Sequence, residues 1–297
     1  MVEPVKPGGE TLDIASLEER KLNEIEHSRK RRLVLKGYER RLDTHASEQA
    51  AGGDSLIGDK QAFEYHGANL KYYSITDSSD AYEREWLRKH CTRGVKVLDF
   101  ACGNGENGIF AASCGAEVSG IDISPEGVDN ANANAREAQV ADHCVFQIMD
   151  GENMSFADDT FDLGVEYGAL HHVDLDRALA ELRRVIKPGG KMICVEALRH
   201  NPLIHAYRKR TPHLRTPWEV EHILGVESLD VARKYFRSVD VRFFHLATLA
   251  AVPFRRTPIF RPLRWFLDRV DDLFLSSQWI GKYAWIMVFV MNDPIKK

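Results

Sequence analysis

The residues of this chain with the clearest chemical signal lie in a glycine-rich stretch, VLDFACGNGENG, at residues 97–108. Gly103, Gly105 and Gly108 give the spacing G-x-G-x-x-G, which often marks a dinucleotide whose pyrophosphate lies at a helix N-terminus. Here, however, Asp99 stands four residues before the first glycine, at the expected end of a strand. Because a carboxylate repels a pyrophosphate and attracts a cation, the stretch predicts a cationic ligand that the backbone approaches closely.

Two further carboxylates follow later apolar segments. Asp122 ends the segment GIDIS, and Asp150 follows the segment CVFQIM. A carboxylate at the end of a second strand can accept hydrogen bonds from both hydroxyls of a ribose. Dinucleotide enzymes also place an acid there, so Asp122 alone does not separate the two classes of ligand.

The elements that must position these residues begin near Val95, where strand-like and helix-like segments alternate. Ser124-Pro125 predicts a helix start, with a serine N-cap and proline in the first turn. The run 187–190, Lys-Pro-Gly-Gly, predicts a helix stop. This order is typical of a doubly wound α/β sheet, which binds ligands at the carboxyl ends of its strands.

These segments resemble the class I S-adenosylmethionine-dependent methyltransferases. The first motif of that family is an acid, three residues and G-x-G, and segments 161–173 and 184–190 match its fourth-strand motif and its Pro-Gly-Gly turn. The resemblance covers roughly residues 70–245 and points to the small-molecule branch, near quinone-type and sugar or natural-product enzymes. It implies a seven-stranded, mostly parallel Rossmann-like sheet with an antiparallel last strand. The implied cofactor is S-adenosylmethionine, and the product is S-adenosylhomocysteine.

The resemblance also implies a set of cofactor contacts. Asp122 and the adjacent Ile123 would hold the ribose, Asp150 the adenine amino group, and Gly151 the adenine ring through its backbone. An aromatic residue before the core, Tyr73, would face the sulfonium, although an ordinary core position is the alternative. The full predicted set is Tyr73, Asp99, Gly103, Gly105, Asp122, Ile123, Asp150, Gly151 and Glu166.

Three titratable residues after the fourth strand are candidates for the base that removes a proton from the acceptor: Glu166, His171 and His172. Histidine suits this task because its unperturbed pKa is about 6.5. Alternatively, the two histidines cap the next helix or pack beside the cofactor, and relatives with unrelated acceptors carry a histidine at the position of His172. A metal site formed with Asp174 and Asp176 is a further reading, but we predict no metal.

The acceptor is expected beneath an insertion after the fifth strand, residues 199–227. Its basic and aromatic side chains could clamp an anionic or sugar-like molecule, or it could be a solvated lid. The predicted acceptor residues are His205, Tyr207, Arg208, His213 and Arg215. We expect methylation at oxygen or nitrogen of a small polar or anionic metabolite. The alternatives are an apolar quinone-like or polyketide-like acceptor, a non-catalytic partner subunit that binds S-adenosylmethionine, and an NAD-dependent oxidoreductase, against which Asp99 argues.

Three regions are predicted along the 297 residues: a helical N-terminal cap (1–90), the methyltransferase core (91–250), and a C-terminal cap with the last strand (251–297). The aromatic residues of the last region are expected to pack on the sheet, to line an apolar pocket or to form a homodimer. The basic run at 29–32 lies among glutamates and reads as a solvated helix face. The net charge of −4, the five scattered cysteines and the absence of a signal-like N-terminus predict a cytoplasmic protein that binds neither nucleic acid nor membrane.

Overall fold

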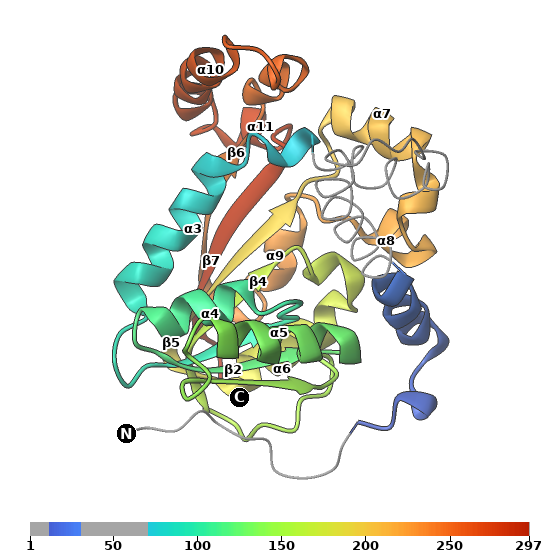
Figure 1. Cartoon of the computed structure of the whole chain (residues 1–297), viewed down its shortest axis with the longest axis vertical. Helices are drawn as coiled ribbons and strands as arrows, with labels where there is room; N and C mark the ends of the chain where they lie inside the picture. The colour runs from blue at the N-terminus through green and yellow to red at the C-terminus, as the bar shows by residue number, and fades with distance from the viewer. Residues whose placement is uncertain (1–11, 31–70, 297) are drawn as a thin grey trace, which may run out of the picture.

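A single seven-stranded sheet organises the computed structural model, which describes residues 12–30 and 71–296 (Figure 1). The strand order is β3-β2-β1-β4-β5-β7-β6. The strands are β1 Lys96–Phe100, β2 Glu117–Asp122, β3 Cys144–Ile148, β4 Phe161–Tyr167, β5 Ile186–Ala197, β6 Phe236–Phe244 and β7 Ile286–Pro294.

The first five strands are parallel to one another, and β7 runs antiparallel between β5 and β6. This confirms the predicted doubly wound fold with an antiparallel last strand. The chain order reverses between β1 and β4, where Phe100 pairs with Glu166. In sheets of this kind, ligands bind at that switch point, beyond the carboxyl ends of the strands.

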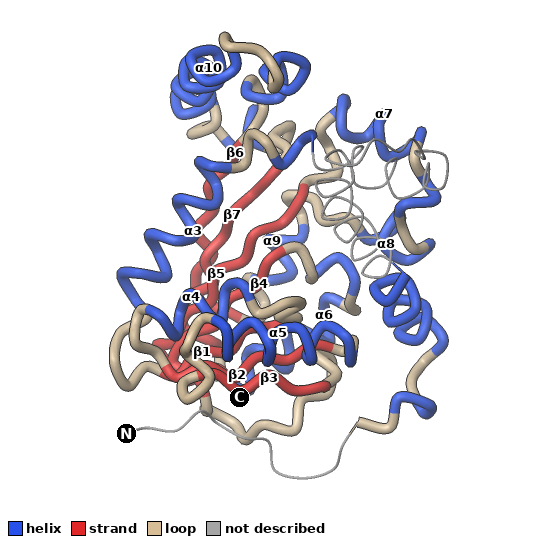
Figure 2. The backbone as a smooth tube through the Cα atoms, in the orientation of Figure 1, coloured by secondary structure: helices blue, strands red, loops and turns tan. Residues whose placement is uncertain are grey.

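Helices cover both faces of the sheet, as the tube in Figure 2 shows. On one face, Leu87, Ala111 and Val128 bring α3 (Asp77–His90), α4 (Glu106–Ser113) and α5 (Pro125–Glu137) into one apolar cluster. On the other face, Leu179 and Leu229 bring α6 (Leu175–Val185) and α9 (Ser228–Ala232) into a second cluster. Burial of these apolar surfaces is the main source of stability of such a fold.

The predicted helix start and helix stop are both found in the structure. The side chain of Ser124 caps α5 by accepting from the backbone N–H of Gly127, with Pro125 in the first turn. The helix α6 ends at Val185, just before the run 187–190. That run belongs to the irregular start of β5 rather than to a separate turn, and Gly189 there has a φ of 74°.

Two segments lie over the carboxyl ends of the strands (Figure 1). One is the insertion after β5, which forms α7 (Pro202–Arg210), η3 (Pro212–Leu214) and α8 (Pro217–His222). The other is helical over residues 19–30, and its Arg20 lies 4.4 Å from the ring centre of Trp218 in α8. Near its end, Arg29 and Lys30 pair with Glu26, consistent with a solvated face, while residues 31 and 32 lie outside the described range.

The C-terminal region departs from expectation. Helix α10 (Phe260–Phe274) and α11 (Gln278–Gly281) lie at one extremity of the molecule (Figure 1). Several of their aromatic side chains, among them Trp265, Phe266 and Trp279, are exposed. The prediction of packing on the sheet was therefore wrong for these three side chains, because Phe260, Leu263 and Leu267 already occupy the inner face of α10. Trp285, from the same region, is buried in the core as predicted. Within residues 12–30 and 71–296, no helix combines the length and apolar character needed to span a bilayer.

Candidate active site

A cavity of about 1030 Å³ lies at the carboxyl ends of the parallel strands. Three carboxylates at or just after the ends of neighbouring strands line its wall: Asp99 in β1, Asp122 in β2 and Asp150 in the loop after β3. Tyr73, Gly103, Ile123 and Gly151 also line it. The elements therefore bring together most of the predicted cofactor residues.

The glycine turn is built around two of these acids. The N–H of Gly103 donates to Asp122 Oδ2, and the N–H of Gly108 donates to Asp99 Oδ2, both at 2.8 Å. A Cβ on Gly108 would lie 2.7 Å from Asp99 Oδ2 and 3.0 Å from the ring of Phe146. Position 108 thus requires glycine for contact with Asp99.

Gly105 serves the turn rather than the cavity wall. It lies outside the described lining, has a φ of 81°, and a Cβ there would meet Ala131 and Phe146 at 2.9 Å. The predicted cofactor contact for Gly105 is replaced by a conformational role, since this φ lies in the left-handed region that glycine adopts most readily.

The cavity holds buried acids where a cation would be favoured. Burial and the nearby Asp122 raise the pKa of Asp99 to about 7, against a hydrogen bond from Gly108 that lowers it. Burial also raises the pKa of Glu83, on α3, to about 8. A bound cation would stabilise both ionised forms, so this end of the cavity suits an ammonium or sulfonium and disfavours a phosphate.

The end of the cavity that the loop after β3 forms is covered by the helix of residues 19–30. Lys21 Nζ lies 2.6 Å from Asp150 and 3.0 Å from Glu152, and Arg20 lies 2.8 Å from Glu152. Asp150 Oδ1 also accepts from the backbone N–H of Glu152. These contacts fix the loop in which Asp150 and Gly151 are expected to meet the adenine.

Gly151 lies against the aromatic ring of a buried residue of β1. A Cβ at this position would lie 2.5 Å from the ring of Phe100. The buried Phe100 therefore explains why this chain has glycine at residue 151.

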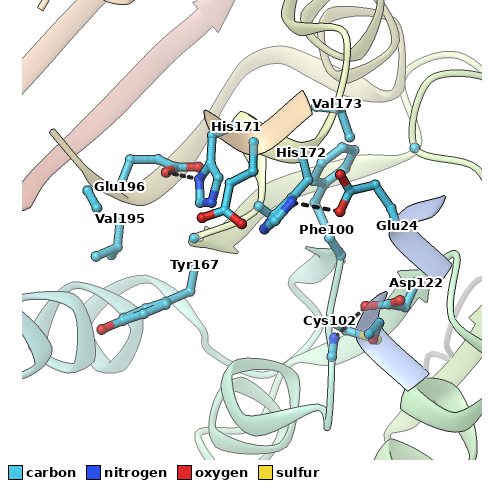
Figure 3. A pocket seen from close by; sticks show the side chains of 18 of the residues that line it. Glu24, Phe100, Cys102, Asp122, Tyr167, His171, His172, Val173, Val195 and Glu196 are labelled. Atoms are coloured by element: carbon cyan, nitrogen blue, oxygen red, sulfur yellow. Dashed lines mark hydrogen bonds and ion pairs between the residues drawn. The ribbon is translucent and has the colours of Figure 1, made fainter. Parts of the chain in front are cut away.

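On the opposite side, two histidines lie between two carboxylates (Figure 3). His171 Nδ1 is 2.7 Å from Glu196 Oε2, and His172 Nδ1 is 3.0 Å from Glu24 Oε2. The two imidazole rings are 4.2 Å apart between centres. Both histidines belong to η2 (Leu170–His172) and line the cavity.

The pKa of His171 reflects two opposed effects. Burial acts to lower it, but the charge of Glu196 and the hydrogen bond to it raise the pKa above the usual value. For Glu196, burial acts to raise the pKa, and His171 lowers it on balance. The Glu196 carboxylate therefore holds the proton of the imidazole at Nδ1 and favours the protonated ring.

Glu166 requires a correction. It is fully buried and lies outside the described lining of the cavity. Its Oε1 accepts from the backbone N–H groups of Ala169 and Leu170, at 2.5 and 3.3 Å. Burial and the neighbouring Glu196 raise its pKa well above the usual value. Glu166 shapes the turn that carries the histidines, and we no longer assign it as base or cofactor ligand.

The histidines and aspartates considered above as a metal site contact different partners. Asp174 caps α6 by accepting from the backbone N–H of Arg177, and Asp176 accepts from the hydroxyl of Tyr235. His171 and His172 face different carboxylates. Over the described part of the chain, no cluster of three such side chains is suited to a metal ion.

The insertion after β5 contributes Tyr207, Arg208 and Arg215 to the cavity wall. Arg208 donates to the carbonyl of Leu198, and burial lowers its pKa to about 10. Arg215 pairs with Glu219 at 3.2 Å. His205 is exposed and lies outside the described lining, so its predicted contact with the acceptor is not supported. The side chain of His213 lies outside the described residues.

Sequence reasoning missed several residues of this site, most importantly Glu196, Lys21 and Glu83. A signal existed for Glu196, which follows the apolar run MICV at the end of a strand, as the other strand-end acids do. Lys21 and Glu83 lie on helices before the core and reach the cavity only through the fold.

Comparison with known proteins points to a methyltransferase domain. Residues 98–194 match the family model described as a methyltransferase domain. The chain is 27% identical over 202 residues to sterol 4-C-methyltransferase strm-1 of Caenorhabditis elegans, covering 65% of this chain and 59% of that protein. It is 34% identical over 124 residues to demethylmenaquinone methyltransferase of Symbiobacterium thermophilum, covering 40% and 49%.

Among solved structures, the chain shares its fold with phosphoethanolamine N-methyltransferase 2 of Haemonchus contortus in complex with S-adenosyl-L-methionine. The TM-score is 0.54 at 19% identity, over 80% of this chain and 59% of that one. The matched segment shows that residues 98–194 form a methyltransferase domain, within a sheet of the class I strand order, and S-adenosylmethionine is the cofactor of that domain. The chain spans about half to three fifths of the length of the two curated relatives.

Proposed function

We propose that the protein transfers a methyl group from S-adenosylmethionine to an oxygen or nitrogen of a small molecule. One observation carries the proposal: a single cavity joins the three strand-end carboxylates to the pair formed by His171 and Glu196. The first group is suited to hold the cofactor, and the second to receive a proton from an acceptor beside it.

When bound, S-adenosylmethionine supplies an electrophilic methyl group on a sulfonium. In our proposal, Asp122 accepts from the ribose hydroxyls, and Asp150 and the backbone of Gly151 contact the adenine. Asp99 and Glu83 favour the positive charge of the cofactor, in agreement with their burial in the wall. Alignment of donor and acceptor in such a site can supply about 7–11 kcal/mol of the barrier.

His171 is proposed as the general base. Since its Nδ1 is engaged by Glu196, the neutral ring has its acceptor at Nε2. An acceptor held beside this ring would give the proton of its O–H or N–H group to Nε2 as its oxygen or nitrogen takes up the methyl group, and the S–C bond to that methyl group would break to leave S-adenosylhomocysteine. Glu196 is a positioning residue that fixes the tautomer and stabilises the resulting imidazolium, and His172, held by Glu24, supports the ring of His171.

For the acceptor, we propose a small molecule with a polar or anionic group. This is supported by Tyr207, Arg208 and Arg215, which bring a hydroxyl and two cations to the wall beneath the insertion. Their partial engagement by Leu198 and Glu219 would fix the guanidinium groups before binding.

A second candidate is an apolar acceptor of the quinone, polyketide or sterol kind. It is supported by the apolar residues on the same side of the cavity: Tyr72, Ile204, Leu214, Ile223, Trp285 and Ile286. The curated relatives named above as sterol and demethylmenaquinone methyltransferases also favour this candidate.

Turnover of S-adenosylmethionine carrying a labelled methyl group tests the proposal. The full chain is incubated with a polar panel of phosphorylated and carboxylated metabolites, and with an apolar panel of quinols, polyketides and sterols. Label transferred to either panel by the wild type, and lost in His171→Ala, supports the methyltransferase and selects the acceptor class. Binding of S-adenosylhomocysteine with no transfer to any acceptor would favour a non-catalytic partner subunit.

A further inference from the structure

The C-terminal helices present an unusual density of exposed apolar side chains. Of the 16 large hydrophobic residues exposed in the described ranges, nine lie between residues 254 and 283. Trp265, Leu273 and Trp279 are 62%, 71% and 82% exposed. The patch consists of Phe254, Ile259, Trp265, Phe266, Leu273, Phe274, Trp279, Ile280 and Tyr283. Single exposed apolar residues are normal, whereas nine of them within one short segment of chain point to an interaction surface.

The patch is held outward by a well-anchored helix. On its inner face, Leu263 and Leu267 pack on the core, and the buried Asp271 accepts from the N–H groups of Leu246, Ala247 and Thr248. Trp265, Phe266 and Leu273 lie on the opposite face, since helical positions separated by seven or eight residues share one side. Because the inner face is satisfied, rotation of α10 could not bury these residues without exposing others.

The charges around the patch are basic. Segment 254–283 contains six basic and three acidic residues, although the whole chain carries a net charge of −4. Two of the three acids are used internally, Asp271 as described and Asp268 in contact with Ser78 and Thr248. Arg256, Arg261 and Arg269 are exposed, and the guanidinium of Arg269 lies 5.6 Å from the ring centre of Trp265.

We propose that this patch docks the protein on the surface of an anionic lipid bilayer. Tryptophan and phenylalanine favour the boundary between headgroups and acyl chains, and arginines around them attract anionic headgroups. The α10–α11 segment is an extremity of the molecule rather than a groove, so it can enter a planar interface (Figure 1). This proposal differs from the expectation that the protein does not bind membranes. That expectation rested on the net charge of the whole chain, which does not show that one segment is basic.

Docking would also orient the cavity. Tyr283 of the patch lies two residues before Trp285, which lines the cavity, and Arg264 of α10 pairs with Asp77 at the start of α3. Tyr73, four residues before Asp77, lines the same end. An acceptor dissolved in the bilayer would therefore meet that end of the cavity first; this consequence rests on the proposed function, whereas the docking itself does not.

Co-sedimentation of the full chain with vesicles tests the proposal. Vesicles of phosphatidylcholine alone are compared with vesicles containing about one third phosphatidylglycerol, at low and high salt. We expect binding to the anionic vesicles that weakens with salt and falls by about tenfold or more in a Trp265→Ser/Phe266→Ser variant. The matched control, Leu203→Ser, removes an apolar side chain that is 65% exposed on α7 and should bind as the wild type does.

Both patch residues are exposed, so the double variant should keep the melting temperature of the wild type, which separates lost docking from lost folding. Failure of the wild type to bind anionic vesicles would overturn the proposal, as would equal binding by the double variant. A dimer of the wild type that the double variant converts to monomer, without vesicle binding, would overturn it in favour of a second copy on this face. None of these measurements uses methyl transfer, so they stand apart from the proposed function.

Discussion

His171 is placed where burial and a carboxylate act on it in opposite directions, and Glu196 prevails. A general base must be neutral to accept a proton, so activity should rise with pH through the raised pKa of His171. In Glu196→Gln, the group that raises this pKa is lost while burial remains, and the acid limb should move to lower pH. The measurement is kcat/KM between pH 5 and 9.

His171→Ala should lower turnover by about 10²–10⁴-fold, the usual contribution of a placed base, with the affinity for S-adenosylhomocysteine almost unchanged. An acid limb that stays in place in Glu196→Gln would show that the pair is structural. A loss confined to cofactor affinity in His171→Ala would likewise assign the ring a packing role.

A second prediction concerns Gly108. Alanine at this position would bring a Cβ to 2.7 Å from Asp99 Oδ2 and 3.0 Å from Phe146, so Asp99 must move. We expect a loss of about 1–3 kcal/mol of stability from overpacking, together with weaker cofactor binding. Thermal unfolding and calorimetric titration with S-adenosylhomocysteine measure both effects. Ser113→Ala, exposed on the same helix, is the control; a variant of Gly108 that matches it would show that the close contact is not required.

At the scale of single residues, the sequence supports a prediction where a side chain stands at a strand end. Asp99, Asp122 and Asp150 were predicted because parallel strands end at one edge of the sheet, and all three line the cavity. Glu166 and Tyr167 are adjacent residues of β4, and successive side chains of a strand point to opposite faces of the sheet. Tyr167 therefore lines the cavity, whereas the side chain of Glu166 does not. Glu196 was overlooked although it too follows an apolar run at a strand end, because it lies outside the motifs on which the resemblance rests.

At the scale of elements, the helix of residues 19–30 closes the end of the cavity beside Asp150 through contacts remote in sequence. Lys21 pairs with Asp150 and Glu152 across about 130 residues of chain, and Glu24 accepts from the hydroxyl of Thr216 in the insertion. No periodicity in the sequence indicates which loop a charged helix will cover. Such pairings are set by the tertiary fold, and only the existence of a helical cap was predicted.

Lys21→Ala should therefore act on both stability and cofactor binding. The lysine is nearly buried, and burial acts to lower its pKa, but its two carboxylate partners raise the pKa on balance. Its removal leaves the two acids without this cation, which we expect to cost about 1–3 kcal/mol of stability. Thermal unfolding with and without S-adenosylhomocysteine measures the effect. Lys30→Ala, on the exposed part of the same helix, should change neither, and equal effects of the two variants would contradict the assigned role of Lys21.

At the scale of the whole molecule, the sheet order follows from the alternation of apolar strands and amphipathic helices, and was predictable. The orientation of α10 was not predictable, because a helix with apolar residues on two sides can be either a buried cap or an exposed docking surface. Packing of Leu263 and Leu267 decides between them. The protein thus has a core whose fold the sequence predicts, and additions before and after it whose orientation the sequence does not indicate.

The central claim is that the strand-end carboxylates form a site for S-adenosylmethionine, and the most direct measurement is ligand-dependent thermal unfolding of the wild type and of Asp122→Ala. At about 100 times its dissociation constant, a ligand stabilises the folded state by about 2.7 kcal/mol, enough to raise the melting temperature by several degrees. We predict this rise with S-adenosylmethionine and S-adenosylhomocysteine, none with NAD, and a greatly reduced rise in Asp122→Ala. A rise with NAD alone, or an Asp122→Ala variant that responds as the wild type does, would contradict the account.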